Sequence, residues 1–340
     1  MKRATLNDVA KKAGVSKATV SYVLNGSKKT ITQETRDKVN KAIKELEYVP
    51  NLGAASLTSK CSRLIGVVIP QTEPGATLMF KNSFYSEILS AIEYRARQLG
   101  YHIIISANDV NESYMKLVYE RNLDGVIVIG MYPDDFYKQF KKIGVPVVLI
   151  DSYCTDKYFH NIRIDDELGG YMATNYMLEK GHRIVAMVSG IRNENGVVNK
   201  RIEGYERALR EHGITPDKDL IFEGNVDFES GVSAAKRLTD SKKEITAVVT
   251  TADILAIGLI KGFAKMNISV PDDYSVIGFD DLEISRYLPV GLTTIKQDIE
   301  KKGELAVELL SKSLEDPEFE SQDIVLDSAI VERESVKRLV

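Results

Sequence analysis

Several residue types are scarce in this chain of 340 residues. It has no tryptophan, two cysteines (Cys61 and Cys154) and four histidines. Two scattered cysteines exclude a disulfide framework and fit a reducing compartment, in which both remain free thiols. The histidines lie apart, without HExxH or Cys/His spacing. We therefore predict no metal site and no cofactor.

Long apolar runs are also missing. The longest, around Ile65–Ile69, is far too short to span a bilayer. The residues from Met1 to Asp8 lack the apolar region of a signal peptide. We therefore expect a cytoplasmic protein that has no membrane partner.

The net charge of −4 conceals an uneven distribution. Residues 1–60 hold twelve Lys/Arg against five Asp/Glu, whereas the other residues hold 33 against 44. This asymmetry favours a basic head that contacts a polyanion, joined to an acidic body that does not. The alternative is a lysine-rich face that is merely solvated.

The basic head has the pattern of three short helices. Thr5 with Asp8 resembles a capping box, and Gly14 ends the first helix in a tight turn. Ser16 caps a second helix, Lys17–Leu24, and a third is expected from Thr32 to about Glu47. Two helices joined by a short Gly-containing turn place the second helix in a major groove.

This pattern predicts a helix-turn-helix domain over residues 1–49. Outward side chains of the second helix are expected to read bases, while hydroxyl groups contact phosphates. The predicted DNA contacts are Thr5, Ser16, Lys17, Ala18, Thr19, Ser21, Tyr22 and Asn25. Plain packing of two helices is the alternative, and the basic charge and polar outward face weigh against it.

Residues 50–62 read as a junction, because small residues and a proline make a stable free helix unfavourable. From residue 63 the pattern changes to buried strands alternating with amphipathic helices, which is typical of parallel α/β sheets. The expected strands are Ile65–Ile69, His102–Ser106, Gly125–Ile129, Val147–Ile150, Ile184–Ser189, Ala247–Thr250, Ser275–Phe279 and Ile324–Leu326. The expected helices are Ser86–Leu99, Glu167–Lys180, Arg201–Glu211, Ser230–Thr239, Ile254–Lys265 and Asp298–Leu314.

This core, residues 63–340, is nearly twice the usual domain length, and the motif Asp165–Gly170 resembles the start of a second β-α-β series. We predict two similar lobes. The first is expected to span approximately 64–162 and 292–320, and the second 163–290 and 321–340. The fold class is α/β, with an all-α head followed by a two-lobed core with parallel sheets.

The motifs resemble those of the lactose/galactose-repressor family along essentially the whole chain. The segment Thr5–Gly26 is the most specific. The other matching segments, in the expected order, are Leu46–Asn51, Asp165–Gly170, Gly181–Arg183, Arg201–Tyr205, Asp253–Gly258, Gly278–Asp281 and Leu292–Ile295. The resemblance implies a repressor that binds a roughly palindromic operator as a homodimer, because two-fold operators need two-fold proteins. A small-molecule effector, a sugar or related polar metabolite, is expected to control it.

In that family the junction forms a hinge helix on operator DNA, and its leucine enters the minor groove. Leu57 matches this position, and an inserted apolar side chain of this kind bends the duplex. Ala55 and Gly53 depart from the family pattern, so the hinge here is expected to be more flexible or to make fewer contacts. The alternative for Leu57 is ordinary packing between domains.

The resemblance also implies an effector site between the lobes of a core similar to periplasmic sugar-binding proteins. The residues that match are Phe84, Tyr85, Arg201, Phe228, Asp253 and Asp280. A guanidinium and a carboxylate bind hydroxyl groups in a dry cleft, and aromatic rings cover apolar faces. Alternatively, Phe84 is a core residue, and Arg201 and Asp280 form only an ion pair. Ala252 stands where many sugar-binding members have asparagine, which removes one hydroxyl contact.

Three other functions fit parts of the pattern. A dinucleotide-binding enzyme lacks the required G-x-G-x-x-G, P-loop or G-x-S-x-G motifs in context, so we expect a protein that is not an enzyme. An extracytoplasmic binding protein conflicts with the basic head and the absent signal peptide. A family member controlled by a phosphoprotein partner stays open. His182, in a helix-to-strand turn, is expected to be structural.

Overall fold

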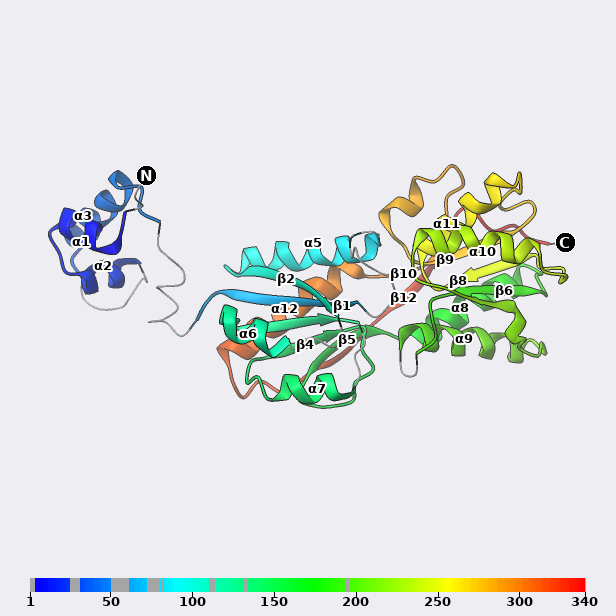
Figure 1. Ribbon diagram of the computed structural model, residues 1–340, viewed down its shortest axis with the longest axis horizontal. Coiled ribbons are helices and arrows are strands. Elements are labelled where there is room, and N and C mark those ends of the chain that lie inside the picture. Colours follow the sequence, from blue (N-terminus) through cyan, green and yellow to red (C-terminus); the bar gives the residue numbers. More distant parts are fainter. Residues whose placement is uncertain are drawn as a thin grey trace. The chain divides into compact units, whose positions relative to one another are not determined.

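The computed structural model describes residues 4–24, 31–49, 61–71, 80, 82–109, 114–130, 134–193 and 196–339. The chain forms two compact units, residues 1–62 and residues 63–340. Figure 1 shows the helices of the first unit and the two α/β lobes of the second. In the described part of the chain, no helix is long and apolar enough to cross a membrane.

The first unit consists of α1 (Leu6–Ala13), α2 (Lys17–Leu24) and α3 (Gln33–Glu45). The predicted capping box is present, because the Thr5 side chain accepts from the N–H of Asp8 and the Asp8 side chain accepts from that of Thr5. Gly14 has φ 68°, a left-handed conformation that favours glycine. The small core comprises Val9, Ala10, Val20, Val39 and Ala42. The three predicted helices are confirmed.

The first lobe contains a six-stranded sheet in which all neighbouring strands are parallel. Its order is β11 (Asp323–Leu326), β5 (His160–Ile164), β4 (Val147–Ile150), β3 (Gly125–Ile129), β1 (Leu64–Gln71) and β2 (His102–Asp109). The central strands β3 and β4 are buried along their whole length. This is expected for a parallel sheet that has helices on both faces.

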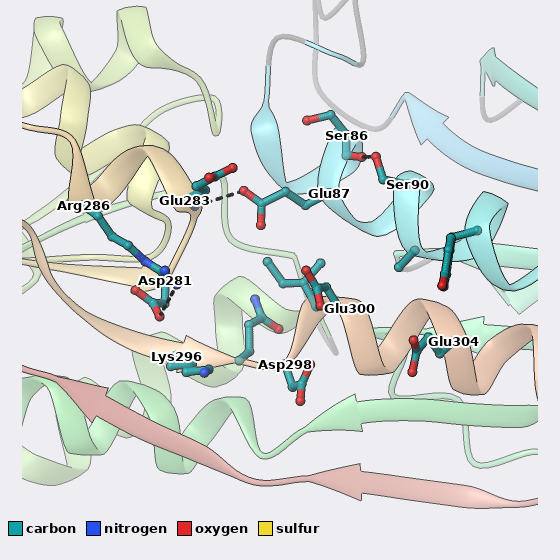
Figure 2. A pocket seen from close by; sticks show the side chains of 14 residues that line it. Ser86, Glu87, Ser90, Asp281, Glu283, Arg286, Lys296, Asp298, Glu300 and Glu304 are labelled. Carbon is teal, nitrogen blue, oxygen red and sulfur yellow. Dashed lines mark hydrogen bonds and ion pairs between the residues drawn. The ribbon is translucent and has the colours of Figure 1, made fainter.

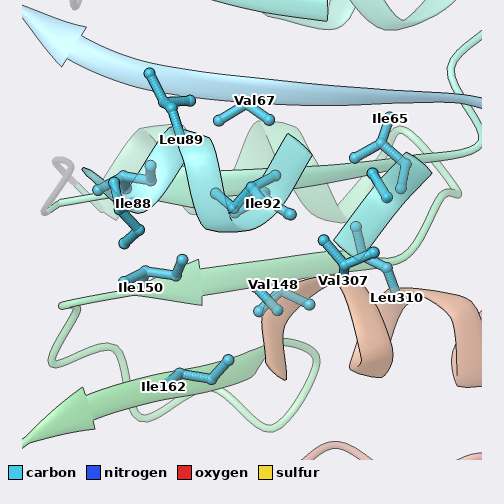
Figure 3. Packing of buried hydrophobic residues seen from close by; sticks show 14 of the residues in the cluster. Ile65, Val67, Ile88, Leu89, Ile92, Val148, Ile150, Ile162, Val307 and Leu310 are labelled. Atoms are coloured by element: carbon cyan, nitrogen blue, oxygen red, sulfur yellow. The ribbon is translucent and has the colours of Figure 1, made fainter. Parts of the chain in front are cut away.

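Two helix layers cover this sheet. On one face, α5 (Ser83–Gln98) and α12 (Ile299–Glu315) bury Ile88, Ile92 and Leu310 against Ile65 and Val148 (Figure 3). On the other face lie α6 (Tyr114–Arg121) and α7 (Asp134–Lys141). Strand β3 supplies both faces, because Ile127 and Ile129 belong to one cluster while Val126 and Val128 belong to the other.

The second lobe repeats this architecture. Its sheet has the order β12 (Ser328–Val331), β10 (Thr293–Gln297), β9 (Ser275–Asp280), β8 (Ala247–Thr250), β6 (Val185–Ser189) and β7 (Ile221–Glu223), and only the β10–β12 pair is antiparallel. Helices α8 (Asp166–Glu179) and α9 (Val197–Glu211) contribute to one core cluster, and α10 (Phe228–Thr239) and α11 (Asp253–Lys265) to another. The 3₁₀ turns are η2 (Lys218–Leu220) and η3 (Glu283–Arg286).

Helices α8 and α9 approach closely because glycines stand at their contact. A Cβ atom added at Gly170 would lie 2.1 Å from the carbonyl oxygen of Arg201, and one added at Gly204 would lie 1.9 Å from that of Glu167. No larger side chain fits at these separations. The motif Asp165–Gly170 therefore has a packing role that also sets the position of Arg201.

The lobe boundaries differ from the prediction. Strand β10 pairs with β9 in the second sheet, whereas residues 292–320 had been expected in the first lobe. Strand β11 pairs with β5 in the first sheet, whereas residues 321–340 had been expected in the second lobe. The chain thus crosses between lobes after Ile164, after Gln297 and at Asp327. Strand pairing, which the motifs alone do not reveal, decides these assignments.

Most predicted strands and helices are present, with ends shifted by a few residues. The prediction missed the strands β5, β7, β10 and β12 and the helices α6 and α7. Strand β7 is short and only partly buried, so its hydrophobic signal is weak. His182 is structural as expected, because it is fully buried and its ring nitrogens contact Thr246 Oγ1 at 2.9 Å and the Lys337 carbonyl at 3.2 Å.

Candidate functional site

The first candidate site is the outward face of α2 in the head. Lys17 and Ala18 are exposed there, while Val20 on the opposite side is fully buried in the head's core. Ser21 and Tyr22 lie one turn further along and are partly exposed. A helix that follows a tight Gly-containing turn and presents small, polar and basic side chains has the shape to enter a major groove.

The predicted phosphate contacts have local roles as well. The Ser16 hydroxyl accepts the N–H of Thr19 at 3.1 Å and contacts the Thr19 hydroxyl at 2.9 Å, so it caps α2. The Thr5 hydroxyl is 2.6 Å from Asp8 Oδ2 within the capping box. Both residues are exposed at the ends of their helices. Asn25 and Leu57 lie outside the described residues.

The second candidate site lies in the core, where strands from both sheets end. Asp151 follows β4 of the first lobe, and Asp280 ends β9 of the second. Both side chains are nearly inaccessible to solvent. Ligands of open α/β sheets bind beyond the carboxyl ends of the strands, which makes these two aspartates candidates for ligand contact.

Arg201 on α9 is the centre of the second-lobe part. Its Nε and Nη2 atoms both lie 2.8 Å from Oδ1 of Asp166, and Nη1 donates to the Thr251 carbonyl at 2.6 Å. The guanidinium also lies 3.6 Å from the centre of the Phe279 ring. A desolvated cation needs such pairing, because an unpaired buried charge is very costly. Arg201 is therefore held in one orientation.

Asp280 stands beside this guanidinium. Its Oδ1 atom is 3.8 Å from Nη1 of Arg201 and accepts the side-chain amide of Gln297 at 2.5 Å. Burial raises the pKa of Asp280 to about 8, although Arg201 opposes the shift. Its backbone has φ 123°, a left-handed value that strains a non-glycine residue. The side chain is thus fixed at a strained position and can gain or lose a proton near neutral pH.

Lys302 extends the network into the first lobe. This lysine is fully buried on α12, and its ammonium group donates to Asp151 Oδ1 and to Gln297 Oε1. Gln297 therefore joins Lys302 of the first lobe to Asp280 of the second. We name the residues Asp151, Asp166, Arg201, Asp280, Gln297 and Lys302 the interlobe network.

The structure gives Asp253 a role within the second lobe. Its carboxylate accepts from Thr294 Oγ1 at 2.6 Å, Ser285 Oγ at 2.7 Å and the Leu282 N–H at 2.9 Å, and the residue is fully buried. Burial raises its pKa to about 7, and these three donors oppose the shift. Because its oxygens accept these three hydrogen bonds within the second lobe, Asp253 positions the 282–285 loop.

The predicted aromatic residues lie against the cores of the two lobes. Phe84 and Tyr85 occupy the first turn of α5, with their rings 5.6 Å apart, and both are partly buried against the first-lobe cluster. Phe228 begins α10 and packs against a second-lobe cluster. Only Arg201 and Asp280, of the six predicted effector residues, lie in the interlobe network.

Four network residues were missed by the prediction. Lys302 could have been identified from the sequence, since it lies on the apolar stripe that contains Ile299, Gly303 and Ala306. A lysine in such a stripe is expected to have a buried partner. Asp166 lies in a quoted motif, but its neighbour Asp165 is the helix cap, with its side chain 2.9 Å from the N–H of Leu168. The sequence alone does not show which of the two aspartates caps the helix and which one pairs with Arg201.

A cavity of about 700 Å³ opens beside the network, between α5 and α12 of the first lobe and the 281–286 loop of the second (Figure 2). Six of its lining residues are carboxylates: Glu87, Asp281, Glu283, Asp298, Glu300 and Glu304. Among the described residues, no group of three or more His, Cys, Asp or Glu side chains is arranged to hold a metal ion. The cavity is an acidic opening at the seam between the lobes.

The pKa of Asp280 leads to a prediction for stability. Because folding raises this pKa, the protonated acid stabilises the fold fully below the pKa of an unfolded aspartate, and this contribution is lost as pH rises towards 8. We expect the free energy of unfolding of the core to fall between pH 5 and pH 8, with a slope of at most about 1.4 kcal/mol per pH unit from this group. Asp280→Asn should flatten the curve, measured by denaturant unfolding.

The matched control is Asp272→Asn, at an exposed aspartate of the same lobe. It should keep the parent slope. Equal slopes in Asp280→Asn and the parent protein would show that Asp280 has the same charge in the folded and unfolded chains.

Comparison with known proteins agrees with this architecture. Residues 5–51 match the model of "Bacterial regulatory proteins, lacI family", and residues 174–336 match a "Periplasmic binding protein-like domain". The chain is 33% identical over 345 residues to the HTH-type transcriptional repressor PurR of Vibrio atlanticus, covering 99% of each. It is 33% identical over 338 residues to catabolite control protein A of Priestia megaterium, covering 98% of this chain and 99% of that protein.

A solved structure is similar to this chain along its whole length. The lac repressor dimer bound to operator and the anti-inducer ONPF is 27% identical, with a TM-score of 0.84, and the match covers 99% of this chain and 100% of that one. These matches confirm the resemblance seen in the motifs. With its helix-turn-helix head and two-lobed core, the chain belongs to the lacI family of bacterial regulatory proteins.

Proposed function

We propose that this DNA-binding transcriptional repressor responds to a small polar metabolite bound beside the interlobe network. The observation that carries the proposal is the network itself, in which Arg201 and Asp280 are joined through Gln297 to Lys302 of the first lobe. A ligand that bonds to these groups contacts both lobes. The ligand is proposed to act by binding alone. The protein is therefore proposed to be a cytoplasmic regulator and not an enzyme.

The head is proposed to read operator DNA through α2. Base contacts are assigned to Lys17, Ala18, Ser21 and Tyr22, whereas Thr5, Ser16, Thr19 and Asn25 position the head on phosphates. Leu57 is proposed to enter the minor groove at the centre of the site and to bend it. Lysines of the basic head displace counterions, so operator affinity is expected to fall steeply with salt.

The operator is proposed to be roughly palindromic and bound by a homodimer. A single head contacts too few base pairs for a unique site, and two heads related by a two-fold axis read two half-sites. The lac repressor, similar to this chain along its length, is a dimer on its operator.

The effector is proposed to be a sugar or a related hydroxylated compound. The Asp280 carboxyl group offers an acceptor, or a donor when protonated, and Arg201 offers charged donors beside it. Such groups bind hydroxyls strongly in a dry site. Phe84, Tyr85 and Phe228 are proposed as apolar walls, which rests on their match to family positions.

The DNA proposal predicts a change of specificity in Tyr22→Ala. Selection from random DNA should first give a two-fold symmetric site for the parent protein. Tyr22→Ala should then lose about 1–3 kcal/mol of discrimination at one position in each half-site, because one side chain contacts few bases. Binding titrations on operators with single base changes measure this effect.

Lys38→Ala is the control, because this residue lies on α3 and pairs with Glu34 at 2.8 Å. It should leave base preference unchanged. A parent protein that selects no sequence at all would contradict the assignment of α2 as a recognition helix.

The effector proposal predicts that Asp280→Ala weakens binding about thirty- to a hundredfold, or about 2–3 kcal/mol, because a buried ligand hydroxyl or guanidinium loses its partner. A thermal-shift screen of the full-length protein against metabolites identifies the ligand, and calorimetry then gives the affinity. Arg201→Lys is the companion variant. It keeps a cation beside Asp166, which Arg201→Ala would leave unpaired.

Asp272→Ala, at an exposed position in the second lobe, should bind the ligand as the parent does. If Asp280→Ala and Arg201→Lys also bind with parent affinity, the effector site lies elsewhere in the protein.

A further inference from the structure

A short segment links the candidate effector site directly to the opposite lobe. Asp280 is the last residue of β9 in the second sheet. Two residues later, the fully buried side chain of Leu282 belongs to the core cluster of the first lobe, together with Ile88 and Ile299. We name Asp280–Glu283 the anchor segment. It starts at the proposed ligand contact and inserts a leucine into the other lobe.

The backbone of the anchor segment has little freedom. Asp280 and Asp281 both have positive φ angles, 123° and 57°, which few non-glycine residues adopt. The Asp281 carboxylate is held by Arg333 at 2.5 Å, and the Leu282 N–H donates to Asp253 at 2.9 Å. The two residues that follow Asp280 are therefore both held in place.

Asp253 gives the segment its rigid support. A Cβ atom on Gly278 would lie 2.0 Å from Oδ1 of Asp253, so the carboxylate packs directly against strand β9. The same group binds Thr294 on β10 and Ser285 beyond the segment. The Asp253 carboxylate thus holds β9, β10 and the chain after the anchor segment together.

On the side of the first lobe, the segment meets helix α5. The N–H of Glu283 donates to Glu87 Oε1 at 3.1 Å, as the dashed line in Figure 2 shows. The neighbouring surfaces leave the acidic cavity between them instead of packing together. Burial raises the pKa of Glu87, and the like charges of Glu283 and Glu300 add to the shift. Arg286 and Lys296 line the same cavity, and Arg286 lies 3.8 Å from Asp281.

We propose that Leu282 is a positioning residue. It transmits a change in the position of Asp280 to helix α5 of the first lobe. The apolar contact of Leu282 is the buried link between the segment and the first-lobe core that contains Ile88 of α5. Packed cores shift between discrete arrangements and do not deform continuously, so a small movement at Asp280 can change how α5 is held. The inference rests on the proposed function in one respect, that the effector acts at Asp280.

Amide hydrogen exchange on the full-length protein tests the coupling without ligand or DNA. Asp280→Gly removes the carboxylate and relieves the backbone constraint at φ 123°, since glycine adopts this angle freely. We expect exchange in α5 to become about fivefold faster or more in this variant. In a Leu282→Ala background, Asp280→Gly should accelerate exchange in α5 by less than about twofold, because the connection through Leu282 is already broken.

Leu292→Ala is the matched control. Leu292 is also fully buried, but it belongs to a core cluster of the second lobe. In this background Asp280→Gly should still accelerate exchange in α5 about fivefold. If Leu282→Ala does not fold, Leu282→Val keeps a shorter apolar side chain and should reduce the coupling in the same direction.

Two results would overturn the proposal. One is an α5 that exchanges at the parent rate in Asp280→Gly, and the other is an equal acceleration with and without Leu282→Ala. Since neither measurement involves an effector, both leave open whether a metabolite binds at Asp280. Conversely, a failure to find ligand binding at Asp280 leaves the measured coupling intact.

Discussion

The requirement that buried charges be paired governs the centre of this molecule. Arg201 and Lys302 are cations without access to solvent, and each is held by an aspartate, Asp166 and Asp151 respectively. An isolated charge at such depth is too costly to persist, so these pairs must form for the core to fold. Because Gln297 bonds both to Lys302 and to Asp280, the pairs become one network across the lobes.

This network lies where the chain passes from one lobe to the other. Gln297 is the last residue of β10, directly before the chain enters α12 of the first lobe. A rearrangement of the lobes therefore changes hydrogen bonds of buried groups, which favours a few discrete states. A ligand shifts the balance between such states only by its difference in affinity for them. The core can thus convert binding at one place into a change in the arrangement of its two lobes.

The sequence predicted the local features better than the long-range ones. The capping box at Thr5 and the helices of the head depend on neighbouring residues, so they could be read directly. The family motifs also assigned Arg201 and Asp280 to the same site, and the two side chains are neighbours in the structure. Strand β10 belongs to the second lobe and β11 to the first because of strand pairing between residues far apart in the sequence, which no local pattern contains. The structural role of Asp253 was hidden for the same reason, since its partners come from positions 282, 285 and 294.

The strained backbone at Asp280 follows from these constraints. A positive φ at a non-glycine residue costs of the order of 1–3 kcal/mol and persists only where the surroundings determine it from several sides. Here Gln297 holds the side chain, and the burial of Leu282 in the other lobe holds the chain that follows. Glycine would remove the strain but also the carboxyl group. The strained backbone at Asp280, its bond to Gln297 and the burial of Leu282 in the other lobe therefore depend on one another.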